Sequence, residues 1–486
     1  MQFHIHLPKI IQGGMGVAIS NWRLARAVAQ AGQLGVISGT GLSRVLISRL
    51  MDGDPGEHMR RAMQSFPFPA AVRDILHHYY IPGGKPPDAP YKSPPAYTIR
   101  PPRLLDQITT IANYVEVWLA KEGHRGPIGI NLLEKVQMPT LASLYGALLA
   151  GVDYVIMGAG IPTQVAGILD SLADHRPVSY RLDLTGGVSD ADVRIPYDPE
   201  DIFPGIAQSV GPLQRPQFLP IISSAVLAQA LLKRSTGSIE GFVIEGPTAG
   251  GHNAPPRGPL KLNEQGEPIY GLRDIVDTDK LRDIGLPFWL AGGYAYPHRL
   301  QEALDAGAAG VQVGTVFALC EESGLDEPLK QGLLAQLLNG EPSVLTSAVV
   351  SPTGFPFKVA QLAGTLSDEA VYAARPRVCD LGFLRTLYKK ADGSLGYRCP
   401  AEPVEAYVRK GGDAQDTVGR GCLCNNLTAT AGYPQRRPDG YLERPLVTAG
   451  TDLETVRQFI QPGQTRYSAL DVIRHLLGSL SPAPGC

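Results

Sequence analysis

The stretch PFWLAGGYAYPHRLQEALDAGAAGVQVGT, residues 287–315, holds two short apolar runs that each end in glycine, with a helix-like segment between them. The runs, 287–293 and 310–315, do not alternate apolar with polar residues, which is typical of parallel strands buried on both faces. A strand, a helix and a second parallel strand form the repeating unit of α/β folds. This stretch therefore predicts one such unit, with its glycines at the carboxyl ends of the strands.

The same pattern recurs along the rest of the chain. Six further runs bring the number of predicted strands to eight, and they cover residues 10–14, 34–38, 128–132, 154–158, 218–223 and 241–246. Helix-like segments such as 22–31 and 225–234 lie between them. Eight alternations predict an α/β fold of the TIM (β/α)₈ barrel type, with functional groups at the C-terminal ends of the strands. An open doubly wound sheet is the alternative.

Three regions exceed this repeat. Two insertions, at about 44–105 and 176–217, interrupt a barrel that we expect to cover residues 1–344. Residues 345–486 form a C-terminal extension that contains five of the six cysteines, four of them between residues 379 and 424. Long insertions at the functional end of a barrel usually cover the site or shape its pocket.

The composition is that of a globular protein. Hydrophobic residues make up 44% of the 486 residues, charged residues 19%, and the net charge is −2, which gives no electrostatic reason to expect nucleic acid or an anionic membrane as partner. The chain lacks a run of the roughly 20 apolar residues that span a bilayer, and its N-terminus has no signal-peptide pattern. We therefore expect a cytoplasmic protein whose cysteines are reduced thiols or metal ligands.

The glycines that end the last two predicted strands indicate a phosphate site. In barrel enzymes the loops after strands 7 and 8 commonly bind phosphate, and glycine lets backbone N–H groups approach its oxygens. Gly292 and Gly293 follow one run, and Gly314 and Thr315 end the other; Thr315 offers a hydroxyl donor, and the following helix would direct its positive end at the anion. The alternative is that these glycines only form tight turns.

A histidine lies in a second glycine-rich loop, EGPTAGGH at 245–252. His252 would then stand at the mouth of the barrel, where an imidazole with an ordinary pKa near 6.5 suits a general base or acid. The alternative is a histidine that only hydrogen-bonds to loop backbone.

A third glycine-rich loop, QGGMG at 12–16, ends the first predicted strand. Its glycines would let the chain pass close to a flat ring, and Met15 offers a polarisable contact. Asn131, at the end of the third predicted strand, could hydrogen-bond to the polar edge of such a ring. The loop could equally be a simple turn before a helix cap at Ser20 or Asn21.

Together these motifs resemble the nitronate monooxygenase (2-nitropropane dioxygenase) family, which is similar in turn to FMN-dependent enoyl-acyl-carrier-protein reductases and to certain NADH:quinone reductases. The matching segments, in chain order, are IIQGGMG, LGVIS, GINL, VIMGAGIP, FVIEGPTAGGH, LAGGY and GAAGVQVGT. The resemblance implies a flavin enzyme on a TIM barrel, with FMN as cofactor and a small-molecule substrate.

The resemblance also implies roles for individual residues. His252 aligns with the family's catalytic histidine, which would remove the α-proton of a nitroalkane or orient the nitronate before O₂ completes turnover. The residues implied to bind FMN are Gln12, Gly13, Gly14, Met15, Asn131, Gly158, Gly160, Glu245, Gly250, Gly251, Gly292, Gly293, Gln312, Gly314 and Thr315.

The chain departs from the family at two points. Asn253-Ala-Pro-Pro follows His252 where the family usually has a pair such as Arg-Gly, and the insertions and extension exceed the compact members. A larger or acyl-like substrate, or reduction by NAD(P)H instead of oxidation by O₂, therefore stays open. The alternative within enzymes is an NAD(P)H-dependent enoyl-acyl or quinone reductase on the same FMN barrel.

The extension raises a separate hypothesis of a metal site. Cys379, Cys399, Cys422 and Cys424 are four thiols in one segment, which predicts a [4Fe–4S] cluster or, second, a structural zinc. The spacing matches neither a ferredoxin nor a zinc ribbon, and the alternative is a set of buried or free thiols.

Two functions outside flavin catalysis stay open from the sequence. One is a flavin-free barrel that acts on a phosphorylated metabolite. Such enzymes often place Lys or Glu at the centre of the barrel, whereas Glu245 is the only acidic residue at the predicted strand ends of this chain. The other is a ligand-binding module without catalysis.

Overall fold

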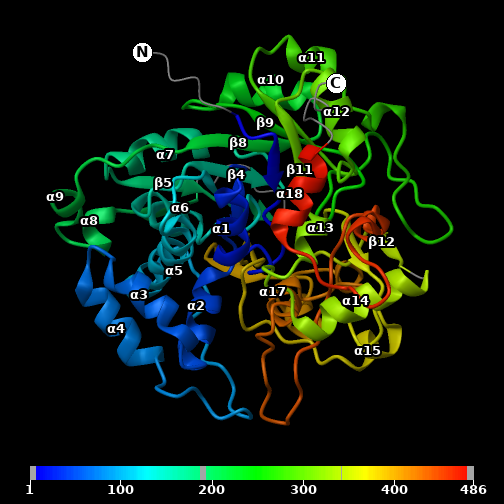
Figure 1. Ribbon diagram of the computed structural model, residues 1–486. Helices are drawn as coiled ribbons and strands as arrows, with labels where there is room; N and C mark the ends of the chain where they lie inside the picture. Colours follow the sequence, from blue (N-terminus) through cyan, green and yellow to red (C-terminus); the bar gives the residue numbers. More distant parts are fainter. Residues whose placement is uncertain (1–6, 186–192, 341, 479–486) are drawn as a thin grey trace, which may run out of the picture.

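The eight predicted strands form one parallel sheet. The computed structural model describes residues 7–185, 193–340 and 342–478 (Figure 1). Its main sheet has the order β1-β11-β10-β9-β8-β4-β3-β2. The strands are β1 (Ile10–Gln12), β2 (Gly35–Ser38), β3 (Ile128–Leu133), β4 (Tyr154–Gly158), β8 (Gln217–Ile222), β9 (Phe242–Glu245), β10 (Phe288–Ala291) and β11 (Gly310–Val313).

Hydrogen bonds between the first and last strands of that order close the sheet. Leu34 N–H donates to the Ile10 carbonyl at 3.1 Å, and Gln12 N–H donates to the Leu34 carbonyl at 3.0 Å. A parallel bridge joins Ile11 to Leu34. The predicted (β/α)₈ barrel is therefore confirmed, and the open doubly wound sheet was the wrong alternative.

The barrel interior is a packed core. A cluster of buried residues separate from the outer core takes side chains from six strands, and Trp289, fully buried, is its largest member. The Trp289 indole N–H donates to the Pro8 carbonyl at 2.8 Å, which satisfies its one polar atom. Strands buried on both faces explain why the sequence runs are continuously apolar.

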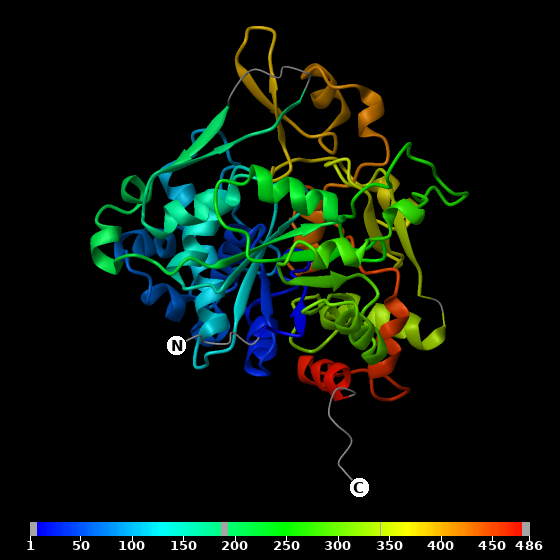
Figure 2. The same cartoon turned by 90° about the horizontal axis from the view of Figure 1, so that it is seen from above.

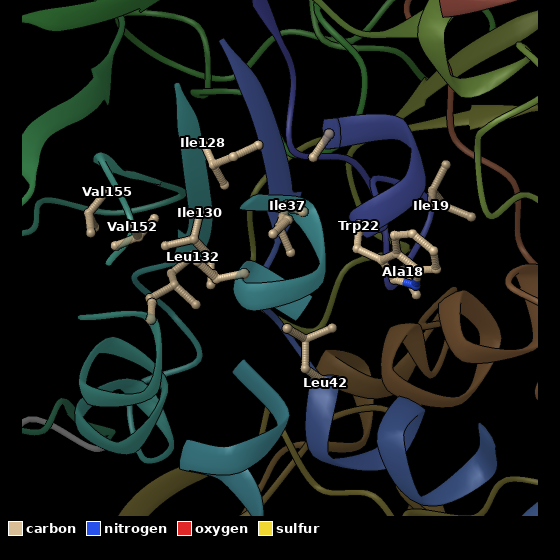
Figure 3. Packing of buried hydrophobic residues seen from close by; sticks show 14 of the residues in the cluster. Ala18, Ile19, Trp22, Ile37, Leu42, Ile128, Ile130, Leu132, Val152 and Val155 are labelled. Carbon is tan, nitrogen blue, oxygen red and sulfur yellow. The ribbon is translucent and has the colours of Figure 1, made fainter. Parts of the chain in front are cut away.

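Helices pack around this barrel and bury its outer face. Trp22 in α1 (Trp22–Gln30) lies against the layer that contains Ile37, Ile130 and Leu132 (Figure 3). The other helices of the barrel layer are α2 (Leu42–Met51), α5 (Arg103–Lys121), α6 (Thr140–Leu149), α7 (Val165–Ala173), α10 (Ala225–Arg234), α11 (Thr278–Arg282), α12 (Pro297–Asp305), α13 (Thr315–Ala318) and α14 (Glu327–Asn339).

The two predicted insertions contain secondary structure. The first holds the 3₁₀ turn η1 (Pro55–Glu57), α3 (His58–Gln64) and α4 (Pro69–Tyr79), followed by a loop that leads to α5. The second holds β5 (Val178–Arg181), β6 (Leu184–Thr185), β7 (Arg194–Tyr197), α8 (Pro199–Ile202) and α9 (Ile206–Val210). The second insertion is thus more regular than its polar, turn-rich sequence predicts. Its residues 186–192 lie outside the described part of the chain.

The C-terminal extension packs against the barrel over much of its length. Its β14 pairs in parallel with β6 of the second insertion, and both lie on one side of the molecule (Figure 2). Leu453, Val456 and Leu476 belong to the same core as the barrel helices. The elements are β12 (Val344–Ser347), β13 (Phe357–Ala360), α15 (Glu369–Ala374), β14 (Thr386–Lys389), β15 (Leu395–Arg398), α16 (Val404–Arg409), η3 (Ala414–Thr417), α17 (Leu423–Thr430), η4 (Leu453–Phe459) and α18 (Ala469–Gly478).

Across residues 7–185, 193–340 and 342–478, no helix is both long enough and apolar enough to span a membrane.

Candidate functional site

One cavity opens at the carboxyl ends of the barrel strands. Its volume is about 220 Å³. Most of the residues that the sequence singled out line it: Gly13, Gly14, Met15, Asn131, Gly158, Glu245, Gly250, Gly251, His252, Gly292, Gly293, Gln312, Gly314 and Thr315. Parallel strands of a closed barrel bring their C-terminal ends to one rim, so residues 300 positions apart meet there.

The two glycine loops predicted to bind phosphate lie on neighbouring strands. Ala291 of β10 pairs with Gln312 of β11, which places the loops that follow side by side. Gly292 has φ +95° and Gly293 φ +78°, and a Cβ on Gly292 would lie 2.8 Å from Thr248 Oγ1. This backbone therefore requires glycine at both points. The helix after Gly314, α13, has only four residues.

The loop after β1 lies against Asn131 at the end of β3. The Asn131 side-chain N–H donates to the Gly14 carbonyl at 3.0 Å. A Cβ on Gly14 would lie 2.3 Å from the Asn131 Cβ, so only glycine allows this approach. The other amide atom, Asn131 Oδ1, is buried and has no hydrogen-bond partner. A ligand in the cavity that offers an N–H donor would satisfy it.

His252 is fixed by the extension. The loop that carries it pairs with β13: Lys358 N–H donates to the Gly251 carbonyl at 3.0 Å, and Asn253 N–H donates to the Pro356 carbonyl at 2.9 Å. The imidazole packs edge-on against Phe357, with ring centroids 4.8 Å apart. Its Nε2 is hydrogen-bonded to Ser351 Oγ at 2.7 Å. Burial lowers the pKa of His252 to about 4, so the ring is neutral at pH 7.

Glu245 ends β9 on the same cavity wall. Burial raises the pKa of its carboxyl to about 7, and the Asn253 amide and the Lys358 ammonium oppose that rise. Lys358 is itself buried, and burial lowers its pKa to about 8 while it donates to Thr346 Oγ1 at 2.7 Å. The cavity thus holds an imidazole and a carboxyl whose pKa values are shifted in opposite directions, which is common at functional sites.

Two predicted flavin contacts lie elsewhere. Gln12 is fully buried, and its side chain accepts a hydrogen bond from Val36 N–H and donates to Ser20 Oγ, so it holds β1 against β2 and does not line the cavity. Gly160 does not line the cavity either, because its backbone lies against the Glu134 carboxyl group. Gln12 and Gly160 are thus not among the residues that line the cavity, and their contact with a flavin stays a prediction.

Sequence reasoning missed the contribution of the extension. Thr448 Oγ1 accepts a hydrogen bond from Gly251 N–H, and Gly450 N–H donates to Thr315 Oγ1, both at 2.9 Å. Residues 447–452 therefore cross the glycine loops of the rim. Extension residues in the lining are Phe357, Phe383, Leu384, Leu423, Cys424, Leu427, Thr430, Val447, Thr448, Ala449 and Asp452. No local sequence motif identifies these extension residues as part of the cavity.

The four cysteines between residues 379 and 424 lie in one apolar cluster. Cys399, Cys422 and Cys424 are buried, and Cys379 is half-buried beside them. Among residues 7–185, 193–340 and 342–478, no group of three or more His, Cys, Asp or Glu side chains has an arrangement that could hold a metal ion. This finding does not support the predicted iron–sulfur cluster or zinc at these thiols, whose surroundings are those of thiols packed in a core.

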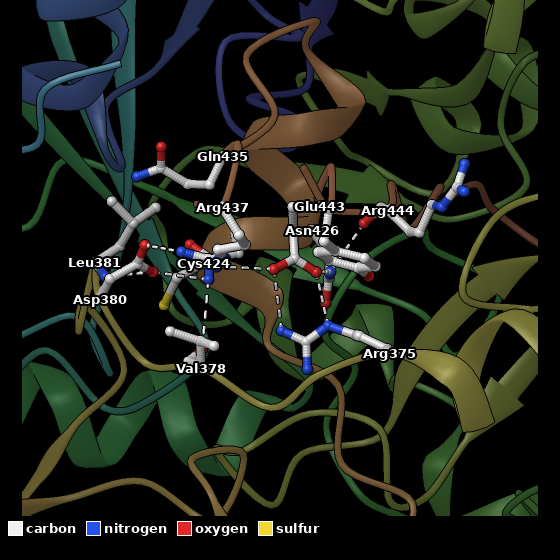
Figure 4. Close-up of polar contacts among 12 residues, drawn as sticks. Arg375, Val378, Asp380, Leu381, Cys424, Asn426, Gln435, Arg437, Glu443 and Arg444 are labelled. Carbon is white, nitrogen blue, oxygen red and sulfur yellow. Dashed lines mark hydrogen bonds and ion pairs between the residues drawn. The ribbon is translucent and has the colours of Figure 1, made fainter. Parts of the chain in front are cut away.

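A buried ion-pair network holds the helix that carries Cys424 (Figure 4). Arg375 Nε donates to Glu443 Oε1 at 2.6 Å, and Arg437 bridges Glu443 and Asp380. Asn426 of α17 donates to the same Glu443 carboxylate at 3.0 Å. Through these bonds the network fixes α17, whose Leu423, Cys424 and Leu427 side chains line the cavity.

With this geometry in view, the chain was compared with protein families. Residues 215–350, which carry His252 and both glycine loops of the rim, match the family model described as nitronate monooxygenase. This segment is similar to the nitronate monooxygenase family. A probable nitronate monooxygenase of Bacillus subtilis is 32% identical over 112 residues, 23% of this chain and 30% of that protein. One of Staphylococcus haemolyticus is 30% identical over 117 residues, 24% of this chain and 31% of that protein. The matches span about a third of these nitronate monooxygenases.

Comparison with solved structures gives likenesses over nearly the whole chain. FabK from Thermotoga maritima is 16% identical with a TM-score of 0.44, covering 97% of this chain and 92% of its own. A nitroalkane oxidase from Streptomyces ansochromogenes is also 16% identical, with a TM-score of 0.45, covering 97% and 95%.

Proposed function

We propose that the chain is an FMN-dependent oxidoreductase of the nitronate monooxygenase type. The observation that carries the proposal is the cavity at the rim, where glycine segments from β1, β9, β10 and β11 leave backbone exposed around the unpartnered Asn131 Oδ1. The residues fit FMN: the glycine loops after β10 and β11 offer backbone N–H groups to a phosphate, and Asn131 Oδ1 offers an acceptor to a ring N–H. The family segment supports the same cofactor.

When bound, FMN would supply the redox chemistry. The residues of the chain would bind and orient it and control protons. Gly292, Gly293, Gly314 and Thr315 would hold the phosphate, and Gly13, Gly14, Met15 and Asn131 would face the ring. Gly158, Glu245, Gly250, Gly251 and Gln312 complete the cavity wall.

His252 is the proposed proton acceptor. Its imidazole lines the cavity and is neutral at pH 7 because burial lowers its pKa to about 4. A neutral imidazole can take the α-proton of a nitroalkane or hydrogen-bond to a nitronate already formed. The nitronate monooxygenase reaction, with O₂ as second substrate, is therefore the first candidate.

The apolar part of the lining favours a second candidate, reduction of an acyl or enoyl-like substrate by NAD(P)H. Leucine, valine and phenylalanine side chains from β3, β13, α14, α17 and several loops line the cavity: Leu132, Leu133, Val136, Leu325, Leu333, Phe357, Phe383, Leu384, Leu423, Leu427 and Val447. A small nitronate does not need so much apolar surface, whereas an acyl chain would bury it favourably.

Two measurements test the proposal. A visible spectrum of the purified protein is expected to show flavin absorbance near 450 nm, and a colourless protein that does not take up added FMN would favour a flavin-free barrel. Anaerobic stopped-flow mixing then separates the candidates. Rapid bleaching by NADPH supports the reductase, whereas bleaching only by a nitronate supports the monooxygenase. If neither bleaches bound flavin, the chain is a binding module and the proposal fails.

A further inference from the structure

His252 lies half-buried on the wall of the first cavity. Its ring packs against the Phe357 ring, and the Phe355 ring centroid is 6.5 Å away. A proton acceptor in such surroundings must pass its proton on before the next turnover. The question is which atoms of this chain carry it.

Two hydroxyl groups continue from the imidazole. His252 Nε2 is hydrogen-bonded to Ser351 Oγ at 2.7 Å, and Ser351 Oγ to Thr353 Oγ1 at 2.8 Å. Ser351 is fully buried, so its hydroxyl contacts only protein. The three groups form an unbroken chain of hydrogen bonds.

The number of hydrogen bonds that the Ser351 hydroxyl can make gives this series of hydrogen bonds a direction. A hydroxyl offers one O–H and two lone pairs. Thr353 N–H, which can only donate, occupies one lone pair of Ser351 Oγ at 3.2 Å. One O–H and one lone pair are left for His252 and Thr353 Oγ1, so Ser351 donates to one of them and accepts from the other. The two arrangements differ in whether His252 Nε2 carries a proton and in the direction in which both hydroxyl groups donate, as in a proton relay.

Thr353 has one bonding position left. Its Oγ1 accepts from Phe355 N–H at 3.3 Å and bonds to Ser351. When Ser351 donates to it, its own O–H is free to donate elsewhere. Thr353 lines a second cavity, distinct from the first, of about 310 Å³.

The second cavity holds charged side chains and reaches the surface. Its lining carries charges of both signs, including Lys135, Asp183, Arg385 and Asp416. Asp183 and Asp416 are exposed. Such a cavity suits water, since water needs several polar partners.

We propose that His252 exchanges its proton with the water of this second cavity through Ser351 and Thr353. The proton on His252 Nε2 moves to Ser351 Oγ as the Ser351 hydroxyl proton moves to Thr353 Oγ1 and the Thr353 hydroxyl proton moves to water. One proton enters the chain and one leaves, and no electron moves. The role in catalysis rests on the proposed function, but the exchange itself does not.

The test measures solvent exchange of the His252 imidazole N–H by NMR on protein with ¹⁵N-labelled histidine. The His252→Gln variant identifies the signal by its loss. Thr353→Val keeps the shape of the side chain and removes the hydroxyl, and we expect exchange at His252 to slow by about 10-fold or more, since positioned proton transfer commonly contributes at least that much. Thr353→Ser, which keeps the hydroxyl, is expected to restore exchange.

A matched control comes from the same cavity. Thr386 also lines it, but its hydroxyl donates to the Arg398 carbonyl at 3.3 Å and does not contact the chain from His252. Thr386→Val is expected to leave exchange at His252 unchanged. The proposal is overturned if Thr353→Val exchanges as fast as the parent, if Thr386→Val slows exchange equally, or if His252 carries its proton only on Nδ1.

Turnover gives an independent readout. Where the protein oxidises or reduces a substrate, Thr353→Val is expected to lower kcat with KM little changed and to raise the solvent deuterium isotope effect. Because NMR exchange needs no substrate, a colourless protein in which Thr353→Val slows exchange would refute the flavin function and keep the relay. A protein that binds flavin but whose Thr353→Val variant exchanges the His252 proton at the parent rate would keep the flavin function and refute the relay.

Discussion

At the scale of single residues, His252 and Glu245 in the cavity lining differ in the sign of their pKa shifts. Burial disfavours the charged form of each: it lowers the pKa of His252 to about 4 and raises that of Glu245 to about 7. Near pH 6 both groups are therefore uncharged. An apolar substrate would then meet neutral donors and acceptors on this wall.

The first prediction concerns the pH dependence of turnover. If neutral His252 accepts the proton, kcat/KM with a neutral nitroalkane falls on the acid side with an apparent pKa near 4, not near the ordinary 6.5. His252→Gln should reduce kcat/KM by about 10²-fold or more. A pH profile with its acid limb near 6.5, or full activity in His252→Gln, would contradict this role.

The second prediction concerns stability and Glu245. Its pKa is raised on folding from 4.5 to about 7, so the unfolded chain loses this proton first, and the stability contributed by the neutral carboxyl falls as pH rises from about 4.5 through 7. Glu245→Gln, which cannot ionise, should be more stable than the parent at pH 8 and nearly equal at pH 5. Denaturant unfolding at both pH values measures this, and an equal difference at both would refute it.

At the scale of structural elements, the rim depends on glycines that no other residue can replace. The third prediction compares two of them with positive φ. Gly292→Ala places a Cβ 2.8 Å from Thr248 Oγ1, whereas Gly266→Ala, with φ +79°, meets nothing within 4 Å. Both should lose about 1 kcal/mol from backbone strain. Only Gly292→Ala should also weaken FMN binding, measured by flavin fluorescence; equal FMN affinity in the two variants would contradict the phosphate assignment.

The fourth prediction concerns the network that fixes α17. Glu443→Gln leaves Arg375, whose side chain is 3% exposed, without the full counter-charge of its partner. Removing one partner of a buried pair typically costs about 3–5 kcal/mol. Urea unfolding should show a loss of this size, and the exposed pair Arg299–Glu302, tested with Glu302→Gln, should show less than about 1 kcal/mol. Similar losses of unfolding free energy in both variants would show that the buried network contributes no more to stability than an exposed ion pair.

The elements also show what the sequence could predict. The eight strands were found because each is a local apolar run, and most cavity residues follow those runs directly. The position of the Gln12 side chain was not predictable, because its neighbours fit a loop while the side chain bonds to β2 through Val36 N–H. Ser351 and Thr448 could not be predicted to lie at the site, since they reach the cavity from far along the chain, and that approach leaves no local pattern.

At the scale of the whole molecule, the extension and the barrel share one core. The fifth prediction follows from the placement of probes: all three tryptophans, Trp22, Trp118 and Trp289, lie before residue 345, and the four clustered cysteines lie after it. Tryptophan fluorescence and thiol labelling of those cysteines should therefore report the same denaturant midpoint. Cysteines that become reactive at clearly lower denaturant would show that the extension unfolds separately.

The crossing of residues 447–452 over the rim has a consequence for biosynthesis. Thr448 and Gly450 bond to loops that were translated about 130 to 200 residues earlier. A ribosome-bound chain that has exposed all eight strands therefore still lacks one wall of its cavity. Cofactor capture should follow release of the finished polypeptide, and a stalled chain ending before residue 447 should hold flavin poorly even when its barrel is already closed.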